Sequence, residues 1–151
     1  MFALSQPSGY ALVALGYLAT GSGKPVLVRT IAEERGLPAP YLSKLIHRLA
    51  KAGIVKTQRG LHGGVTLAVD PAECSIMRIC RILGDPILEQ RCLLGVARCA
   101  DVRACPAHGF ASVAREQATA FLERTTIAEI GGFELSQTET LLNDIARDDV
   151  S

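Results

Sequence analysis

The stretch that decides the fold is APYLSKLIHRLAKAGIVKTQRGLHGGVTLAV, residues 39–69. Pro40 suits the first turn of a helix and Gly53 follows its end, so we predict a helix over 40–52. Apolar residues recur three and four positions apart and mark its buried face: Leu42, Leu45, Ile46 and Leu49. The opposite face carries Tyr41, Lys44, His47, Arg48 and Lys51. No acidic residue occurs between Arg35 and Asp70, so this face is uniformly basic.

Two β-rich runs, 54–58 and 65–69, follow this helix and flank the glycine-rich segment 59–64. The pattern predicts a hairpin whose tip contains Gly60, Gly63 and Gly64. Glycines let the backbone at such a tip approach a phosphate closely, and Arg59 at its base suits a narrow, negative minor groove. A hairpin directly after a basic helix is typical of the wing of a winged helix-turn-helix unit.

The residues before residue 39 complete that unit. Apolar spacing predicts a helix over 8–20 that ends before Gly21, and a short helix over 30–35 that ends at Gly36. Helix, tight turn and helix form the DNA-binding supersecondary unit. Residues 1–69 contain eight Lys and Arg against two Glu, a net +6, whereas residues 70–151 contain eight basic and thirteen acidic residues, a net −5. This asymmetry indicates an N-terminal half that faces a polyanion, double-stranded DNA.

The residues after the hairpin predict a helical extension. Ser75 can cap a helix over 76–83, with Cys74 and Ile79 as a hydrophobic staple across its start, and Cys80 falls on its buried face. An irregular stretch follows, and then a long apolar stripe at helical spacing: Phe110, Val113, Ala114, Gln117, Ala118, Phe121 and Leu122. Thr126 and Glu129 form a capping box for a last short helix. A small monomer has little core to cover the stripe, so we expect a homodimer.

The expected fold is therefore mainly α with a small β-wing: a winged helix-turn-helix domain plus a long dimerisation helix. The expected regions are the DNA-binding domain at 1–84, a cysteine-rich cluster-binding loop at 85–106, the dimerisation helix region at 107–132 and a C-terminal tail at 133–151. The N-terminus lacks the features of a secretory signal, and no apolar run reaches membrane-spanning length. We therefore expect a cytoplasmic protein without a membrane partner.

Three of the five cysteines lie within fourteen residues, Cys92, Cys99 and Cys105, and His108 follows. Thiolates and imidazoles are ligands of iron–sulfur clusters and of zinc. Structural zinc pairs have narrower gaps, so these spacings favour a cluster. Neighbouring Arg91, Arg98 and Arg103 favour thiolates and offset the negative charge of such a cluster.

The sequence resembles the Rrf2 family of bacterial transcription regulators over residues 4–132. The residues that carry the resemblance are Tyr10-Ala11-Leu12, residues 39–46 (APYLSKLI), Gly53-Ile54-Val55, Arg59-Gly60, Gly63-Gly64 and the three-cysteine loop. The resemblance implies a dimer with crossed long helices, in which the state of an iron–sulfur cluster alters the affinity for operator DNA. Members with such a loop include cluster-assembly, nitric-oxide-sensitive and iron-responsive regulators.

The resemblance also implies the ligands: Cys92, Cys99 and Cys105, with His108 as the fourth. Some members use an N-terminal carboxylate instead, but no Asp or Glu precedes Glu33, and Ser8 stands in that region. A histidine three residues after the last cysteine matches the 2Fe-2S pattern of the cluster-assembly regulators. The six-residue gap after Cys92 is one longer than in that pattern, so a 4Fe-4S cluster stays open. At the wing tip, Leu61-His62 replaces the Pro-Gly of many relatives.

The expected function is thus a DNA-binding regulator and not an enzyme, since no nucleophile–base or acid pair stands out. Major-groove contacts are expected from Tyr41, Ser43, Lys44, His47 and Arg48, and backbone and minor-groove contacts from Arg59 and the wing glycines. Three alternatives remain. The same fold could sense oxidants through its thiols without a cluster, it could be controlled by a protein partner, or the chain could be an iron–sulfur electron-transfer component.

Overall fold

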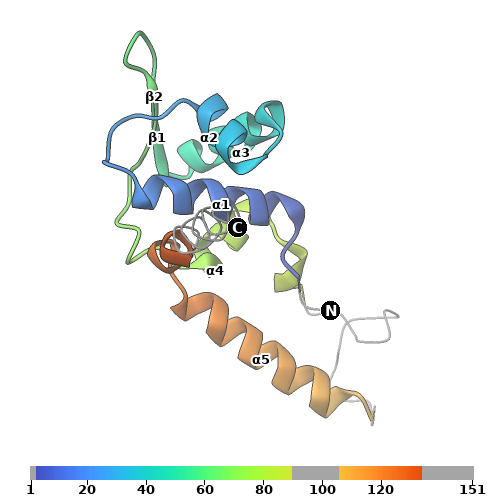
Figure 1. Cartoon of the computed structure of the whole chain (residues 1–151). Coiled ribbons are helices and arrows are strands. Elements are labelled where there is room, and N and C mark those ends of the chain that lie inside the picture. The colour runs from blue at the N-terminus through green and yellow to red at the C-terminus, as the bar shows by residue number, and fades with distance from the viewer. Residues whose placement is uncertain (1–2, 90–105, 134–151) are drawn as a thin grey trace, which may run out of the picture.

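The computed structural model describes residues 3–89 and 106–133. The elements run in the order α1 (Gln6–Thr20), α2 (Val28–Arg35), α3 (Ala39–Lys51), β1 (Val55–Gln58), β2 (Gly64–Leu67), α4 (Ile76–Leu83), the 3₁₀ turn η1 (Pro86–Leu88) and α5 (His108–Arg124). Residues 127–133 are also helical. In Figure 1, α1 crosses the middle of the molecule, with α2, α3 and the hairpin on one side and α4 on the other, while α5 reaches away. The predicted fold class, mainly helical with a small β-wing, is confirmed.

Local signals explain most of these boundaries. Gly36 and Gly84 follow α2 and α4 with φ of 62° and 64°, the left-handed conformation that ends a helix at little cost for glycine. The Ser75 hydroxyl accepts a hydrogen bond from the backbone N–H of Arg78, as expected for the cap of α4. Helix α2 begins at Val28, two residues before the predicted start at residue 30, and its N-cap Leu27 makes no side-chain cap.

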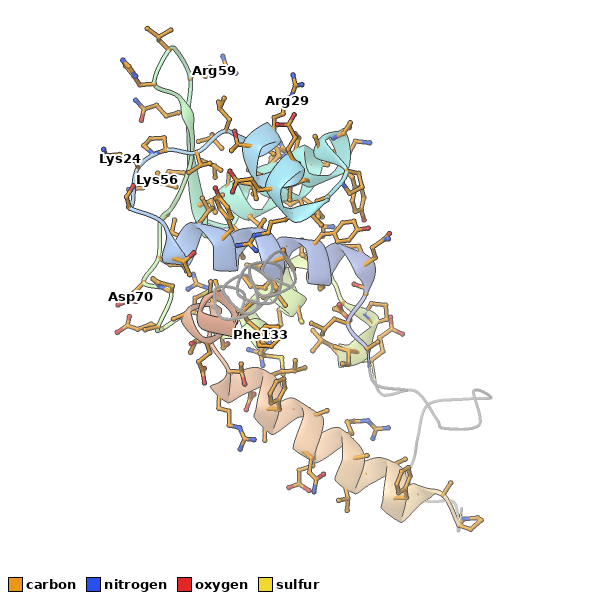
Figure 2. All side chains as sticks on the ribbon, viewed as in Figure 1. Lys24, Arg29, Lys56, Arg59, Asp70 and Phe133 are labelled. Carbon is orange, nitrogen blue, oxygen red and sulfur yellow. The ribbon has the colours of Figure 1, made fainter. Side chains whose placement is uncertain are left out.

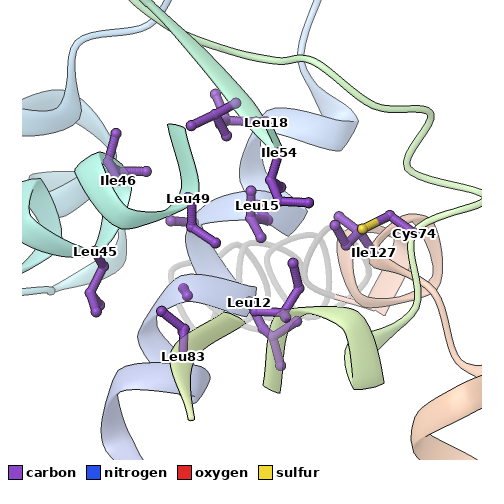
Figure 3. Close-up of a cluster of buried hydrophobic side chains, with 14 of the residues drawn as sticks. Leu12, Leu15, Leu18, Leu45, Ile46, Leu49, Ile54, Cys74, Leu83 and Ile127 are labelled. Carbon is purple, nitrogen blue, oxygen red and sulfur yellow. The ribbon is translucent and has the colours of Figure 1, made fainter. Parts of the chain in front are cut away.

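The core lies where α1 passes between α3 and α4 (Figure 3). The predicted buried face of α3 is confirmed, because Leu42, Leu45, Ile46 and Leu49 are at most 3% exposed. Leu15 of α1 and Ile54, which precedes β1, are fully buried beside them. At about 1.5–3 kcal/mol for each large apolar side chain removed from water, this cluster supplies the main stabilisation of the domain.

The hairpin pairs β1 with β2 in antiparallel register, from Val55 opposite Leu67 to Gln58 opposite Gly64. Its base is extended by Val26, whose backbone exchanges hydrogen bonds of 3.0 and 2.8 Å with Val65. Gly64 makes this close approach possible. Its φ is 150°, and a Cβ atom there would lie 2.6 Å from the Val26 carbonyl oxygen. The segment before α2 therefore holds the hairpin in a fixed direction on the body.

After α5 the chain returns to the core. Thr126 and Glu129 form the predicted capping box: the Thr126 backbone N–H donates to Glu129 Oε2 at 2.7 Å, and the Glu129 backbone N–H donates to Thr126 Oγ1 at 3.4 Å. Ile127 is fully buried, and its N–H donates to the Cys74 carbonyl oxygen. The helical residues 127–133 thus pack into the same core as α1 and α4.

Two glycines allow that packing. A Cβ atom on Gly131 would lie 2.8 Å from the Gly16 carbonyl oxygen and 2.9 Å from a methyl carbon of Thr20. A Cβ atom on Gly16 would lie 3.2 Å from the Gly131 nitrogen. Because the obstacle at Gly131 includes backbone, α1 and residues 127–133 must separate if that glycine acquires a side chain. Sequence patterns did not predict this crossing.

We expect Gly131→Ala to lower the free energy of unfolding by roughly 1–3 kcal/mol, the usual cost of overpacking a tight contact. Gly132→Ala is the matched control, since nothing lies within 4 Å of its added Cβ. There alanine should be neutral or slightly stabilising, because it favours helix over glycine. Urea denaturation of both variants measures the difference. Equal stabilities would show that the close crossing is not required.

A buried carboxylate fastens the N-terminus to the end of α4. Asp85 is 2% exposed and accepts hydrogen bonds from the Ser5 N–H at 3.0 Å, the Ser5 hydroxyl at 2.7 Å and the Ile87 N–H at 2.9 Å. Burial alone raises the pKa of this carboxyl. Hydrogen bonds from the Ser8 and Ser5 hydroxyls and from the Ile87 and Ser5 amides outweigh burial and hold the pKa below its ordinary value.

Candidate nucleic-acid interface

The outward face of α3 is exposed and basic. Lys44, His47 and Lys51 lie on it without cover from the rest of the described chain, on the side opposite the buried leucines. Ser43 is also exposed, and its hydroxyl donates to the Ala39 carbonyl oxygen at 2.9 Å. The hydroxyl oxygen keeps lone pairs that can still accept a hydrogen bond. This face can therefore offer cationic donors and a hydroxyl to a polyanion.

Two of the predicted contact residues lie on the flank of α3 instead of its outermost face. Tyr41 is half-buried and packs edge-on against Tyr10 of α1, with ring centroids 6.0 Å apart. The Arg48 side chain is exposed, but its Nη2 donates to the carbonyl oxygen of Ile82 in α4 at 3.0 Å. The positions differ by seven residues, two helical turns, so both side chains lie on the same side of α3. This flank of α3 therefore contacts α1 and α4.

The wing supplies a second exposed cationic surface. Arg59 stands near the tip of the hairpin, and Lys56 and Lys24 lie nearer its base (Figure 2). All three side chains are exposed. Lys24 comes from the loop after α1, and sequence reasoning did not select it or Lys56 as contact residues. Their contribution to the positive charge of residues 1–69 was the available signal.

The wing glycines have roles within the hairpin itself. Gly60 has φ of 105° and open space around it. A Cβ atom on Gly63 would overlap the Gln58 carbonyl oxygen, and the Gly63 N–H donates to the Gly60 carbonyl oxygen at 2.9 Å. Gly63 and Gly64 are thus required by the turn and by Val26, whereas Gly60 leaves its surroundings open to an approaching ligand. The tip also displays Leu61, which is 96% exposed.

Helix α5 forms a different kind of surface. Its buried residues are Ala111 and Leu122, and it contacts α4, where Arg81 lies 3.7 Å from Glu123. Large apolar side chains elsewhere along it stay open to solvent: Phe110 is 68%, Val113 54% and Phe121 47% exposed. Apart from Leu122, the large apolar side chains of the predicted stripe therefore stay largely uncovered within the described part of the chain.

The candidate cluster ligands fall largely outside the described residues. Cys92, Cys99 and Cys105 belong to the undescribed segment 90–105. His108 is the first residue of α5 and is half-buried. Within 3–89 and 106–133, no group of three or more His, Cys, Asp or Glu is placed to hold a metal ion. The structure thus places one of the four expected ligands.

The two remaining cysteines have the apolar role expected from the sequence. Cys74 and Cys80 are both fully buried, and neither forms a disulfide. Burial raises the pKa of the Cys74 thiol, and burial together with the nearby Asp85 charge raises the pKa of Cys80 to about 11. Both therefore stay protonated at neutral pH and are poor nucleophiles.

The described residues include no helix that is both long and apolar enough to span a membrane.

Comparisons with known proteins agree with this architecture. The Rrf2 family model, described as an iron-dependent transcriptional regulator, matches residues 4–132. An HTH-type transcriptional regulator of Aquifex aeolicus is 34% identical over 127 residues, which cover 83% of this chain and 88% of that protein.

Two solved structures are similar over most of the described fold. The Bacillus subtilis global cysteine regulator CymR has a TM-score of 0.73 at 26% identity, over 88% of this chain and 98% of its own. IscR of T. potens has a TM-score of 0.66 at 28% identity, over 85% of both chains. These matches favour a regulator over an electron-transfer component. The chain belongs to the Rrf2 family of winged-helix transcriptional regulators.

Proposed function

We propose that this regulator binds operator DNA as a homodimer and that an iron–sulfur cluster controls its affinity. The observation that carries the DNA-binding part is the exposed, acid-free outer face of α3 beside an exposed cationic wing. Ser43, Lys44 and His47 would meet base edges and phosphates in the major groove. Arg59 and the open backbone at Gly60 would follow the neighbouring phosphates and the minor groove.

The exposed stripe of α5 supports the homodimer. Phe110, Val113 and Phe121 lie on one side of the helix, and Thr119 lies opposite them by helical spacing. A second copy of the same helix offers a complementary apolar surface, and a two-fold arrangement presents two recognition helices to two DNA half-sites. Dimerisation is therefore the proposed function of this surface.

We expect Phe121→Glu to convert the dimer to monomer at micromolar concentration, because it places a charge within the apolar contact. Thr119→Glu introduces the same charge on the opposite side and should leave the dimer intact. Sedimentation equilibrium distinguishes the two masses. A wild-type monomer, or a dimer that tolerates Phe121→Glu as well as Thr119→Glu, would refute the assignment of this stripe.

The cluster part of the proposal rests on the donor set and on the relatives. Three thiols and an imidazole within Cys92–His108 match the ligand chemistry of a 2Fe-2S cluster, which we favour, with 4Fe-4S as the alternative. The matching family model is described as iron-dependent, and IscR is among the similar structures. When bound, a cluster supplies a group whose charge and integrity change with oxidation, iron supply or nitric oxide.

The position of His108 links that chemistry to the fold. His108 is the first residue of α5, and α5 carries the proposed dimer contact. Through its contact with α4, α5 also adjoins the body that holds α3. A protein ligand at this point can therefore influence how the two recognition helices are presented, and couplings of about 1–3 kcal/mol are typical of such links.

The test is spectroscopic and precedes any DNA assay. Protein purified anaerobically should show the visible absorption and Mössbauer spectrum of a 2Fe-2S cluster, perturbed by Cys99→Ala and by His108→Ala. Cys74→Ala is the control, because that buried thiol lies outside the proposed ligand set. If the spectrum is that of a 4Fe-4S cluster and His108→Ala does not change it, both the proposed 2Fe-2S type and His108 as the fourth ligand are wrong. Protein without iron after reconstitution would refute cluster control.

A specific observation favours one second candidate, a regulator controlled by thiol chemistry or by a protein partner. The structure with a TM-score of 0.73 is that of a protein named the global cysteine regulator. Under this alternative, the three loop cysteines would respond to oxidants by forming disulfides or sulfenates. Colourless protein whose DNA affinity changes reversibly with peroxide and thiol would support it.

A further inference from the structure

One arginine on the recognition helix bonds to protein where DNA contacts would be expected. Arg48 Nη2 donates to the Ile82 carbonyl oxygen at 3.0 Å and so joins α3 to the last turn of α4. Apolar side chains make the rest of the packing between α3 and α4, and the hydrogen bond adds a directional constraint to it.

The Ile82 carbonyl needs this partner. In a continued helix it would accept from the residue four positions later, which is Pro86 and has no N–H. The neighbouring carbonyls are already satisfied: Arg81 accepts from the Gly84 N–H at 3.3 Å and Cys80 from the Asp85 N–H at 2.9 Å. A guanidinium at this helix end also complements the negative end of the α4 dipole.

The same end of α4 is fixed in another direction. Asp85, three residues after Ile82, holds the N-terminal segment through Ser5. On the α3 side, the flank that carries Arg48 also carries Tyr41, packed against Tyr10 of α1. Arg48 therefore lies where α1, α3 and the end of α4 meet, and α4 in turn contacts α5.

We propose that Arg48 is a positioning residue: its bond to Ile82 fixes the angle between α3 and α4 and so directs the basic face toward DNA. The proposal rests on the proposed DNA-binding function, and it removes Arg48 from the set of direct contacts. It assigns the phosphate and base contacts of α3 to the outer face, with Lys44, about one helical turn before Arg48, as the cationic residue for comparison.

The first measurement requires no DNA. Backbone N–H residual dipolar couplings report the relative orientation of α3 and α4 in the intact protein. The couplings measured for Arg48→Met should fit an angle between α3 and α4 that differs from the wild-type angle. Those measured for Lys44→Met should fit the wild-type angle. Methionine keeps the apolar stem of either side chain, so the comparison isolates the charged head. An unchanged angle in Arg48→Met would overturn the proposal, whatever the protein does with DNA.

The second measurement separates positioning from contact. A residue that neutralises a phosphate contributes about one unit to the slope of log K against log salt, and its removal reduces that slope. On a duplex selected in vitro by the wild-type protein, Arg48→Met should weaken binding about tenfold, a loss of about 1.4 kcal/mol, with the slope unchanged. Lys44→Met should reduce the slope.

Half-site spacing gives the readout that general loss of stability would not alter. Because a tilted α3 changes the separation of the two reading faces, Arg48→Met should lose the wild-type preference among duplexes with altered half-site spacing. A reduced salt slope with the spacing preference retained would make Arg48 a phosphate contact and overturn the proposal. If wild-type protein selects no duplex while the coupling result holds, the DNA-binding function fails and the positioning of α3 by Arg48 stands.

Discussion

The double variant Lys44→Glu, Arg59→Glu should bind its selected duplex about 1,000-fold more weakly than wild type, equivalent to roughly 2 kcal/mol for each lost contact. Both side chains are exposed, one on the outer face of α3 and the other near the wing tip. Each substitution replaces attraction to phosphate by repulsion, so the losses should add where the two surfaces contact the same duplex. Fluorescence anisotropy at several salt concentrations measures both the affinity and its slope.

The control is Arg124→Glu, which makes the same charge change in the last turn of α5, away from both surfaces. It should alter affinity by no more than the small long-range effect of net charge. Circular dichroism and thermal unfolding should show that all these variants are folded. Equal weakening by Arg124→Glu would mean that net charge, and not the α3 and wing surfaces, governs binding.

Asp85→Ala should lower the free energy of unfolding by about 4 kcal/mol, since each buried donor left without a partner costs about 1–3 kcal/mol. The donors concerned are the Ser5 N–H and hydroxyl and the Ile87 N–H. Asp70→Ala is the matched control: that exposed carboxylate accepts from the Ala72 N–H at 2.8 Å, and water can replace it. Urea denaturation at pH 7 compares the two variants.

Asp85→Asn tests the contribution of the negative charge to stability. It can also replace the alanine variant in the comparison if that variant does not fold. The hydrogen bonds at Asp85 hold its folded-state pKa below the ordinary value of 3.8. The stabilisation from the charged form is therefore complete above the unfolded pKa, and it is lost as pH falls through the folded pKa. The stability gap between wild type and Asp85→Asn should be full at pH 6 and shrink below about pH 4. A gap independent of pH would contradict the assignment.

The sequence predicted those features whose signals are local. The period of Leu42, Leu45, Ile46 and Leu49 was enough to orient α3 toward the core. Ser75 and the Thr126–Glu129 pair act within one helical turn, so their hydrogen bonds follow from spacing alone. The hairpin is likewise set by alternation and glycine, although its strands are shorter than predicted.

Features that depend on distant parts of the chain were not predictable in this way. Arg48 has the same outward spacing as a DNA-contacting residue, but its partner, the Ile82 carbonyl, lies thirty-four positions away. Asp85 reads as part of a turn that ends α4, yet it is buried by contact with Ser5, eighty positions earlier. No periodic sequence pattern signals the close approach of Gly16 and Gly131. Such contacts arise from packing, which single-sequence patterns do not encode.

In the candidate site, too, the features that follow from local patterns were predicted and those that depend on distant contacts were not. The exposure of Lys44, His47 and Arg59 follows from period and turn position, and the structure agrees with it. Tyr41 lies half-buried on the flank of α3 because it packs against Tyr10 of α1, and no spacing rule connects these two residues. The roles of all these residues in DNA recognition, and of Cys92, Cys99, Cys105 and His108 in holding a cluster, stay predictions.

Figure 1 shows α5 extending away from the body toward its N-terminal end, which gives the helix the mechanics of a lever. Leu122, near its C-terminal end, is buried, whereas near the other end the small Ala111 is buried and Phe110 beside it is mostly exposed. Seventeen residues make a rod of about 25 Å, so a 10° tilt at the seated end would displace the far end by about 4 Å. A small change in packing where α5 contacts α4 is thus amplified at His108. Conversely, a displacement of His108 would exert a torque on the contact between α5 and α4.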